Sequence, residues 1–291
     1  MRFGKIKTQY FFSDVEIHRI RLAATLVSLI GLCGATIGVR AESFAVPTNY
    51  KLVWADEFNA NGVPDVRKWS YNTDRNKAGW HNHELQYYSA QRAENAVVKD
   101  GFLLITARKE KMSAQGDWGG QRYTSARLTT QGRAEWTYGF FEVRAKMPCG
   151  KGTWPAIWTL GNKDKWPDSG ELDIMEHVGS DPTRISSAIH TLAGHGSQVV
   201  YGAARITDVC SEFHRYQMHW TSDAVTFGVD GFAHLNYPRL DVDSRAWPFN
   251  RPQYLLLNVA IGGDLGGEVD DGIFPVAMQV DYVRVYQAIK P

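Results

Sequence analysis

The sequence predicts an all-β domain, a sandwich or jelly roll of two antiparallel sheets. Short runs that alternate apolar and polar residues recur between turn signals, as in GFLLITARK (101–109), GFFEVRAKM (139–147) and AVTFGVDG (224–231). Asp-Gly pairs at 100–101 and 230–231 favour hairpin turns, because both residue types tolerate positive φ. No window sustains a period of 3.6 residues, so the interleaved helices of a parallel α/β fold are not expected.

Residues 1–41 read as a secretory signal that precedes the fold. A basic lead is followed by an uncharged apolar run at 22–39 and by a passable cleavage site after Ala41. The run is also long enough to raise the alternatives of a membrane anchor or of a lipid on Cys33, but its glycines and small residues favour cleavage. We therefore expect a secreted or periplasmic protein without stable membrane association, with a single domain at 42–291.

Composition narrows the classes of function. The 291 residues carry a formal net charge of +1, and the body of the chain has no dense block of Lys or Arg, so a nucleic-acid partner is not expected. The chain has 10 Trp, 13 Tyr and 13 Phe, most of which should fill a core. Because sugar rings present flat apolar faces that stack on indoles, the surplus of aromatic residues is also a hint of carbohydrate binding.

Two cysteines fall within the expected domain, Cys149 and Cys210. In an exported protein such a pair can form one disulfide. The sequence does not tell whether their Cα atoms come within bridging distance. A disulfide and two buried free thiols therefore both remain open.

The segment GELDIMEHVG (170–179) places three carboxylates in a run that otherwise resembles a core strand. Side chains alternate between the two faces of a strand, so Glu171 and Asp173 share a face, whereas Glu176 would point to the other one. A β-bulge at 174–175 would return Glu176 to the shared face and leave one bulge residue in the core. Crowded carboxylates with separated pKa values are the apparatus of glycoside hydrolysis. The alternatives are an exposed acidic edge strand and a calcium loop, although a calcium loop would not occur in an apolar β run.

The same strand resembles the active-site strand of glycoside hydrolase family 16 in its bulged form, E-x-D-x-x-E. The resemblance extends in the family's order over about residues 50–287, through VWADEFN, HELQYY, ENAVVKDGFLLITA, YTSARLTTQGR, YGFFEVRAKMPCGKGTWPAIWTLG, FHRYQMHW and VDYVRVYQ. HELQYY, GTWPAIWTLG and WPDSGELDIME together resemble the laminarinase group, which cuts β-1,3-glucans. The family fold is a jelly-roll sandwich with a concave substrate cleft, which agrees with the strand pattern.

The resemblance implies an endo-acting, retaining double displacement at the three carboxylates. Glu171 would be the nucleophile, and Glu176 would be first the general acid and then the general base. Asp173 would hydrogen-bond the nucleophile. A β-glucan polysaccharide would be the substrate, no cofactor would take part in catalysis, and we expect a monomer.

The resemblance also assigns residues to the substrate cleft. Two match tryptophans of the sugar subsites, two match polar residues that contact sugar hydroxyls, one matches a histidine that faces the catalytic strand, and one precedes that strand and could stack on a sugar. They are, in that order, Trp154 and Trp158, Asn95 and Arg127, His190, and Trp166. The two subsite tryptophans also share a strand face by parity. For them the alternative is core packing, and for the histidine it is a satisfied polar group.

A structural calcium ion is the one metal that the resemblance implies. Family members often hold Ca²⁺ on the convex side with main-chain oxygens and one aspartate, and the matching positions are Glu57, Gly101 and Asp281. The alternative is that Asp281 caps or pairs at the end of a strand. The HNHE segment at 81–84 lacks a further ligand at useful spacing, so no metal is expected there.

Three other functions remain open at this stage. The family has other specificities, for mixed-linkage glucan, agarose or carrageenan, and some members could transfer the sugar to another sugar instead of to water. Both choices depend on details of the cleft that the sequence does not resolve. A non-catalytic glucan-binding protein is the alternative outside enzymes, and the presence of both Glu171 and Glu176 argues against it. His83, where laminarinases commonly show Asn, leaves the choice of glucan open.

Overall fold

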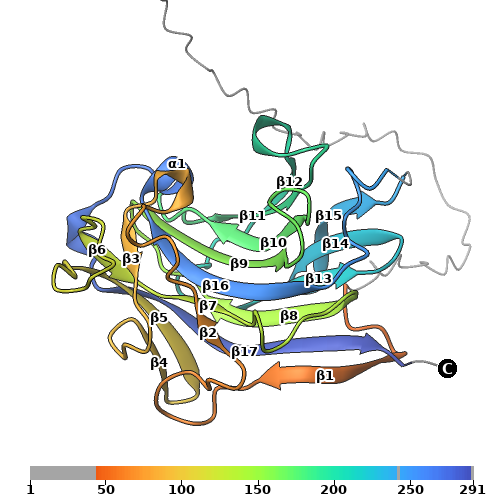
Figure 1. Ribbon diagram of the computed structural model, residues 1–291. Helices are drawn as coiled ribbons and strands as arrows, with labels where there is room; N and C mark the ends of the chain where they lie inside the picture. Colours follow the sequence, from red (N-terminus) through yellow and green to blue (C-terminus); the bar gives the residue numbers. More distant parts are fainter. Residues whose placement is uncertain (1–43, 241–242, 290–291) are drawn as a thin grey trace, which may run out of the picture. The chain divides into compact units, whose positions relative to one another are not determined.

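The computed structural model describes residues 44–240 and 243–289, which form two β-sheets packed face to face (Figure 1). The signal expected at 1–41 lies outside the described residues. The expectation of an all-β sandwich rich in antiparallel pairs is confirmed, since helical segments in the described part of the chain are only three or four residues long. One short pair departs from the antiparallel pattern, because β3 (Gln86–Tyr88) runs parallel to β6 (Tyr123–Ser125).

The seven-stranded sheet carries the acidic segment near its middle. Its strands follow the order β12-β11-β10-β9-β16-β7-β2, and Figure 1 shows this sheet curving above the other one. Its strands are β2 (Ser70–Tyr71), β7 (Arg127–Thr129), β9 (Thr153–Gly161), β10 (Glu171–His177), β11 (Arg184–His190), β12 (Val200–Arg205) and β16 (Gln253–Ile261). β9 and β16 pair without interruption along their whole lengths, so β10 lies beside a strand whose register is fixed.

The ten-stranded sheet forms the second layer. Its main path is β15-β14-β13-β8-β17-β5-β6-β3, with β1 paired to β17 and β4 paired to β5. Its other strands are β1 (Tyr50–Asp56), β4 (Ala96–Lys99), β5 (Phe102–Lys109), β8 (Gly139–Lys146), β13 (His214–Trp220), β14 (Ala224–Val229), β15 (Phe232–Pro238) and β17 (Val276–Ala288). The two predicted Asp-Gly turns join β4 to β5 and β14 to β15, and Asp100 and Asp230 have positive φ there.

Apolar side chains from the facing surfaces of the two sheets form the core. Trp69, Trp220, Phe141 and Leu257 are among the side chains that are almost completely buried. Burial of each such side chain contributes roughly 1.5–3 kcal/mol to folding. Because side chains alternate along a strand, this core also determines which residues of β9, β10 and β11 face outward.

The helical segments lie in the loops around the sheets. They are η1 (His81–His83), η2 (Gly196–Gln198), α1 (Gly263–Gly266) and η3 (Asp271–Ile273), and Figure 1 shows α1 at one end of the curved sheet. Within the residues that the structure describes, no helix has the length and apolar character needed to span a membrane.

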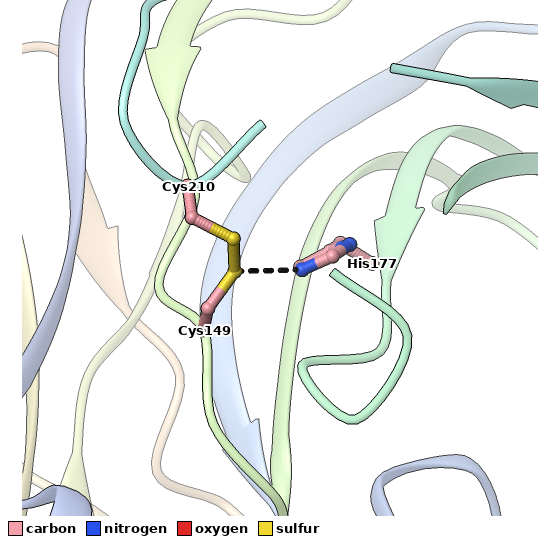
Figure 2. Close-up of side chains that lie close together, drawn as sticks. All are labelled: Cys149, His177 and Cys210. Carbon is pink, nitrogen blue, oxygen red and sulfur yellow. Dashed lines mark hydrogen bonds between the residues drawn. A yellow bond between two sulfur atoms is a disulfide. The ribbon is translucent and has the colours of Figure 1, made fainter. Parts of the chain in front are cut away.

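A disulfide joins Cys149, in the turn after β8, to Cys210, in the loop before β13 (Figure 2). The two Cα atoms lie 5.8 Å apart. His177, the last residue of β10, places Nε2 at 3.4 Å from Sγ of Cys149 and Nδ1 at 2.8 Å from the main-chain oxygen of Arg184. Of the two states left open by the sequence, the structure has the bridge, and it lies against the end of the acidic strand.

Candidate active site

The bulge predicted in the acidic segment is present in β10. Asp173 lies opposite Ala188 of β11 but Glu176 lies opposite Ser186, so three steps along β10 correspond to two along its neighbour. The register with β9 shifts in the same segment. The extra residue reverses the alternation of side chains, and the carboxyl groups of Glu171, Asp173 and Glu176 therefore lie on one face of the sheet.

Apolar residues between the carboxylates hold β10 against the core. Leu172, Ile174 and Met175 are all completely buried. The expectation that only one of the two bulge residues would enter the core was wrong. Both turn inward, because Asp173 and Glu176 flank the bulge and occupy the outward face.

Each glutamate accepts a hydrogen bond from a tryptophan. Nε1 of Trp166 donates to Oε2 of Glu171 over 2.7 Å, and Nε1 of Trp154 donates to Oε1 of Glu176 over 3.0 Å. Trp154 is almost buried, whereas the ring of Trp166 is half exposed. These indoles therefore orient the carboxyl groups, and Trp166 keeps an accessible face beside Glu171.

Asp173 lies at the centre of the acidic cluster and is nearly buried. Nε2 of His190, on β11, lies 3.2 Å from Oδ2 of Asp173, and His190 is directly opposite Glu171 in the register of the two strands. One side-chain ligand atom from each of Glu171, Asp173 and His190 falls within 4.8 Å of the other two. The structure thus places His190 against the acidic strand, where the resemblance expects it.

Burial raises the pKa of all three carboxyl groups. Desolvation, together with the charge of Asp173, raises the pKa of Glu171 from 4.5 to about 8. Desolvation and the charge of Glu176 raise the pKa of Asp173 well above its ordinary range, and desolvation also raises the pKa of Glu176. The three groups lie close enough to titrate as one set, which retains protons at neutral pH.

Aromatic and polar side chains continue the same face across β9, β16 and β7. Trp158 lies opposite Asp173 in register, and its Nε1 donates to Oδ1 of Asn258 over 2.8 Å. The guanidinium carbon of Arg127 lies 4.6 Å from the ring centroid of Trp158 and 5.1 Å from that of Trp80. The structure therefore brings Trp158 and Arg127 to the site beside the carboxylates.

Asn95 lies outside this site, contrary to the prediction. Its side chain is completely buried and all of its hydrogen-bonding groups have protein partners. Oδ1 accepts from Oγ of Ser89 and from Nη1 of Arg92, and Nδ2 donates to the main-chain oxygen of Thr106 and to Oγ1 of Thr124. A sugar hydroxyl could not reach this amide, so Asn95 holds the strands β4, β5 and β6 together instead.

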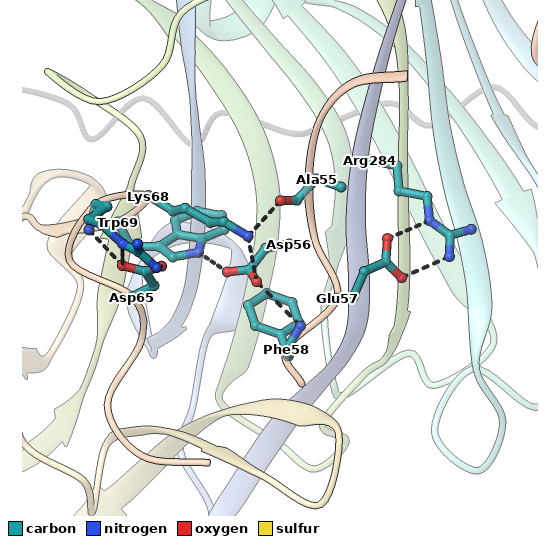
Figure 3. Close-up of polar contacts among 9 residues, drawn as sticks. Ala55, Asp56, Glu57, Phe58, Asp65, Lys68, Trp69 and Arg284 are labelled. Atoms are coloured by element: carbon teal, nitrogen blue, oxygen red, sulfur yellow. Dashed lines mark hydrogen bonds and ion pairs between the residues drawn. The ribbon is translucent and has the colours of Figure 1, made fainter. Parts of the chain in front are cut away.

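The three positions expected to bind calcium lie along the middle of β17. Asp56, the last residue of β1, pairs with Val283, so Glu57 follows beside the middle of β17, and Val280 pairs with Leu103, two residues after Gly101 in the β4–β5 turn. Figure 3 shows both carboxylate oxygens of Glu57 bound by Arg284, so only its main-chain oxygen could be a ligand. Nη1 of Arg144 donates to Oδ2 of Asp281, so Oδ1 would be the oxygen to face a cation. Main-chain oxygens with one carboxylate oxygen are a donor set that fits Ca²⁺.

Two residues near the site were not predicted as part of it. Asn258 is a single polar residue in the otherwise apolar interior of β16, and besides Trp158 it contacts the hydroxyl of Tyr88 over 3.1 Å. Glu84 is held by Nε2 of Gln86 over 2.8 Å, and burial raises its pKa. An isolated amide in a buried strand was the signal that could have found Asn258, whereas Glu84 was considered only as a metal ligand in the HNHE segment.

A β-sandwich that displays paired carboxyl groups between tryptophans on one sheet face has the arrangement of a glycoside hydrolase. The family model of the glycosyl hydrolases family 16 matches residues 81–284. A β-glucanase of Rhodothermus marinus is 42% identical over 286 residues, which cover 93% of this chain and 96% of that protein. The chain belongs to glycosyl hydrolase family 16.

Solved structures agree in fold. SCLam, described as a non-specific endo-β-1,3(4)-glucanase, superposes with a TM-score of 0.83 at 51% identity, covering 85% of this chain and 95% of SCLam. The laminarinase of Rhodothermus marinus has a TM-score of 0.77 at 43% identity, covering 83% of this chain and 98% of that one. The jelly-roll expectation and the family resemblance are both confirmed.

Proposed function

We propose that this glycoside hydrolase is an endo-β-1,3-glucanase of the laminarinase type. The observation that carries the proposal is the bulged strand β10, which sets Glu171, Asp173 and Glu176 on one face between Trp154 and Trp166. The similarity of the chain, over nearly all of its described length, to proteins described as a β-glucanase and a laminarinase supports β-1,3-glucan as the substrate.

The proposed reaction is a double displacement with retention at the anomeric carbon. The carboxylate of Glu171 attacks the anomeric carbon and forms a glycosyl-enzyme ester, while Glu176 donates its proton to the leaving glycosidic oxygen. Glu176 then takes a proton from water, the water oxygen attacks the anomeric carbon, and Glu171 leaves as a carboxylate. Two inversions give net retention.

The surroundings of the carboxyl groups suit these roles. The raised pKa of Glu176 keeps a proton available for the leaving group. The raised pKa of Asp173 favours its protonated form, which removes the negative charge that otherwise raises the pKa of Glu171. Nε1 of Trp166 donates to Glu171 and lowers its pKa, which favours the carboxylate that attacks. A protonated Asp173 therefore eases the ionisation of Glu171 that the first step requires.

The side chains beside the carboxylates suit a chain of sugars. The Trp158 ring carries the Arg127 guanidinium over it, and Trp166 is half exposed next to the nucleophile. Such aromatic faces stack on pyranose rings, and a curved, open sheet face admits an internal segment of a polymer. Internal cleavage is accordingly the proposed mode. Mixed-linkage glucan, agarose or carrageenan as substrates, and transglycosylation, are the outcomes that product analysis separates from it.

The remaining parts of the proposal concern the whole chain. We propose export with cleavage after Ala41, action as a monomer, and a structural Ca²⁺ held by the main-chain oxygens of Glu57 and Gly101 with Asp281. Calcium would stabilise the ten-stranded sheet, to which the acidic strand does not belong, and would take no part in the reaction.

Incubation of the purified domain 42–291 with laminarin, lichenan and agarose tests the proposal. Early products from laminarin should be a ladder of oligosaccharides with β-1,3 linkages, and NMR should show the β anomer first. Release of glucose alone from chain ends would contradict internal cleavage. Activity on agarose with none on laminarin would contradict the proposed specificity.

A further inference from the structure

Ile174, in the bulge of β10, has no register partner on either β9 or β11. Its main-chain oxygen accepts a hydrogen bond from Oγ of Ser187 over 2.8 Å. Ser187 is completely buried and lies on the core side of β11, between Ser186 and Ala188, which pair on either side of the bulge. Its hydroxyl thus binds a buried main-chain acceptor within the bulge.

A histidine from the opposite sheet completes this contact. Nε2 of His234, on β15, lies 2.9 Å from Oγ of Ser187. Within the described part of the chain, Nδ1 of His234 is buried without a hydrogen-bond partner, so the ring proton belongs on Nε2. Burial lowers the pKa of His234 to about 4, which keeps the ring neutral at neutral pH. Nε2 therefore donates to Ser187, and Ser187 donates to Ile174.

The packing of β12 against β15 lets His234 approach Ser187. Gly202 on β12 is the register partner of Ser187. A Cβ atom at Gly202 would lie 2.7 Å from Cβ of Leu235 and 3.2 Å from the main-chain oxygen of His234. A larger residue at 202 would push β15 away, so the glycine is what lets His234 reach the back of the acidic strand.

We propose that Ser187 and His234 are positioning residues that hold the β10 bulge and thereby set Glu176 relative to Glu171. This inference rests on the proposed function, in which Glu176 is the general acid. Loss of the bulge, or its shift by one residue toward Glu176, would turn Glu176 toward the core, because strand parity has a period of two. Residues 171–173 pair regularly with both neighbours, so loss of the clamp acts on Glu176 more than on Glu171.

The alternative is that the pair only satisfies two polar groups in the core. A purely structural role would lower stability without altering the chemistry of native molecules. A positioning role would weaken proton donation to the leaving group. The two roles differ for a substrate whose leaving group needs no proton, because such a substrate does not depend on Glu176 in the first step.

The experiment compares kcat/KM for laminarin and for 2,4-dinitrophenyl β-laminaribioside in the domain 42–291. The variants are Ser187→Ala, His234→Leu and His234→Gln, the last of which keeps a donor at the position of Nε2. Ile185→Ala is the matched control, since Ile185 is another completely buried, core-facing residue of β11. Each is assayed well below its melting temperature, so that only native molecules are compared.

We expect Ser187→Ala and His234→Leu to lower kcat/KM for laminarin by about tenfold or more, which is a part of the about 10²–10⁴-fold that general acid catalysis supplies. The aryl glycoside should lose less than about threefold, His234→Gln should recover most of the activity on laminarin, and Ile185→Ala should change neither substrate. Equal losses on both substrates, or no loss on either, overturns the positioning role. If Ser187→Ala does not fold, the two His234 variants test the positioning role by the same ratio, that of kcat/KM for laminarin to kcat/KM for the aryl glycoside.

A wrong proposed function would give a different experimental result from a wrong inference about Ser187 and His234. If the wild-type domain does not cleave laminarin, the proposed specificity is wrong, and the same ratio is measured on whichever polysaccharide the wild type cleaves. If the wild type cleaves laminarin and the ratio stays constant in all variants, only the inference about Ser187 and His234 is wrong.

Discussion

Replacement of Glu171 by Gln should stabilise the protein while abolishing hydrolysis. The pKa of Glu171 is raised from 4.5 to about 8, chiefly by desolvation. Between these values the native state holds a proton that the unfolded chain releases, so the stability of the wild type falls as pH rises from about 4.5 to about 8. Gln resembles the protonated glutamate and does not titrate. Its Oε1 can still accept from Nε1 of Trp166.

The pKa shift sets the size of the effect. One pKa unit corresponds to about 1.4 kcal/mol. At pH 7 Glu171 is ionised in the unfolded chain but protonated in the native state, which lowers the free energy of unfolding by about 3 kcal/mol. Glu171 shares its titration with Asp173 and Glu176, which reduces the part that one substitution recovers. We expect a gain of about 2–3 kcal/mol at pH 7, which for a domain of this size is about 5–10 °C in Tm.

Thermal or urea unfolding of both proteins from pH 4 to pH 8 measures this gain. The difference between Glu171→Gln and wild type should be near zero at pH 4 and should grow up to pH 8. Asp168→Asn is the control, because Asp168 is an exposed carboxylate three residues before Glu171 and its loss should change stability by less than about 0.5 kcal/mol. A difference that is constant with pH, or a less stable variant at pH 8, would refute the assignment of a buried, protonated Glu171.

Other predictions concern the second glutamate, the pH profile, the disulfide and calcium. Glu176→Ala should retain the first step on an activated aryl glycoside, and azide should restore turnover and give the β-glycosyl azide by NMR; an α product would exchange the two glutamate roles. The acidic limb of kcat/KM should lie well above pH 4.5, because only ionised Glu171 attacks; a limb near 4 contradicts this. Cys210→Ser should lower unfolding free energy by about 4 kcal/mol, given the 61-residue separation of the bridge, with kcat little changed. Chelator should lower the Tm of the wild type but not that of Asp281→Ala, and an unchanged wild-type Tm would mean that no calcium is bound.

The fold could be predicted because its determinants are local. The Asp-Gly turns at 100–101 and 230–231 and the alternating runs between turns fix hairpins without knowledge of distant contacts. The order of strands, by contrast, depends on contacts between segments that are distant in sequence. β8 lies between β13 and β17, which are far from it in sequence, and such pairings depend on the assembled core. Strand pattern alone indicated a sandwich or jelly roll, and the order of motifs shared with the family decided for the jelly roll.

The site was predictable where one strand carries it. Spacing in 171–176 implied the bulge and the shared face, since parity is a property of the strand itself. Asn95 shows the limit, because whether a polar side chain faces sugar or neighbouring strands depends on partners such as Thr124 that only the assembled sheet brings close. Asn258 shows the converse, since its place beside Trp158 results from the pairing of β16 with β9.

The donors around the carboxyl groups explain how one strand keeps a usable acid at neutral pH. The groups that lower the pKa of Glu171 and Glu176 are Trp166, Trp154 and His190, and neither Arg nor Lys is among them. An arginine in direct contact would ionise these glutamates and remove the proton that the leaving group needs. Arg127, the nearby cation, is instead held over the rings of Trp158 and Trp80. Indole N–H groups can orient a carboxyl group in either protonation state. The two glutamates are therefore held in position while the acid keeps its proton.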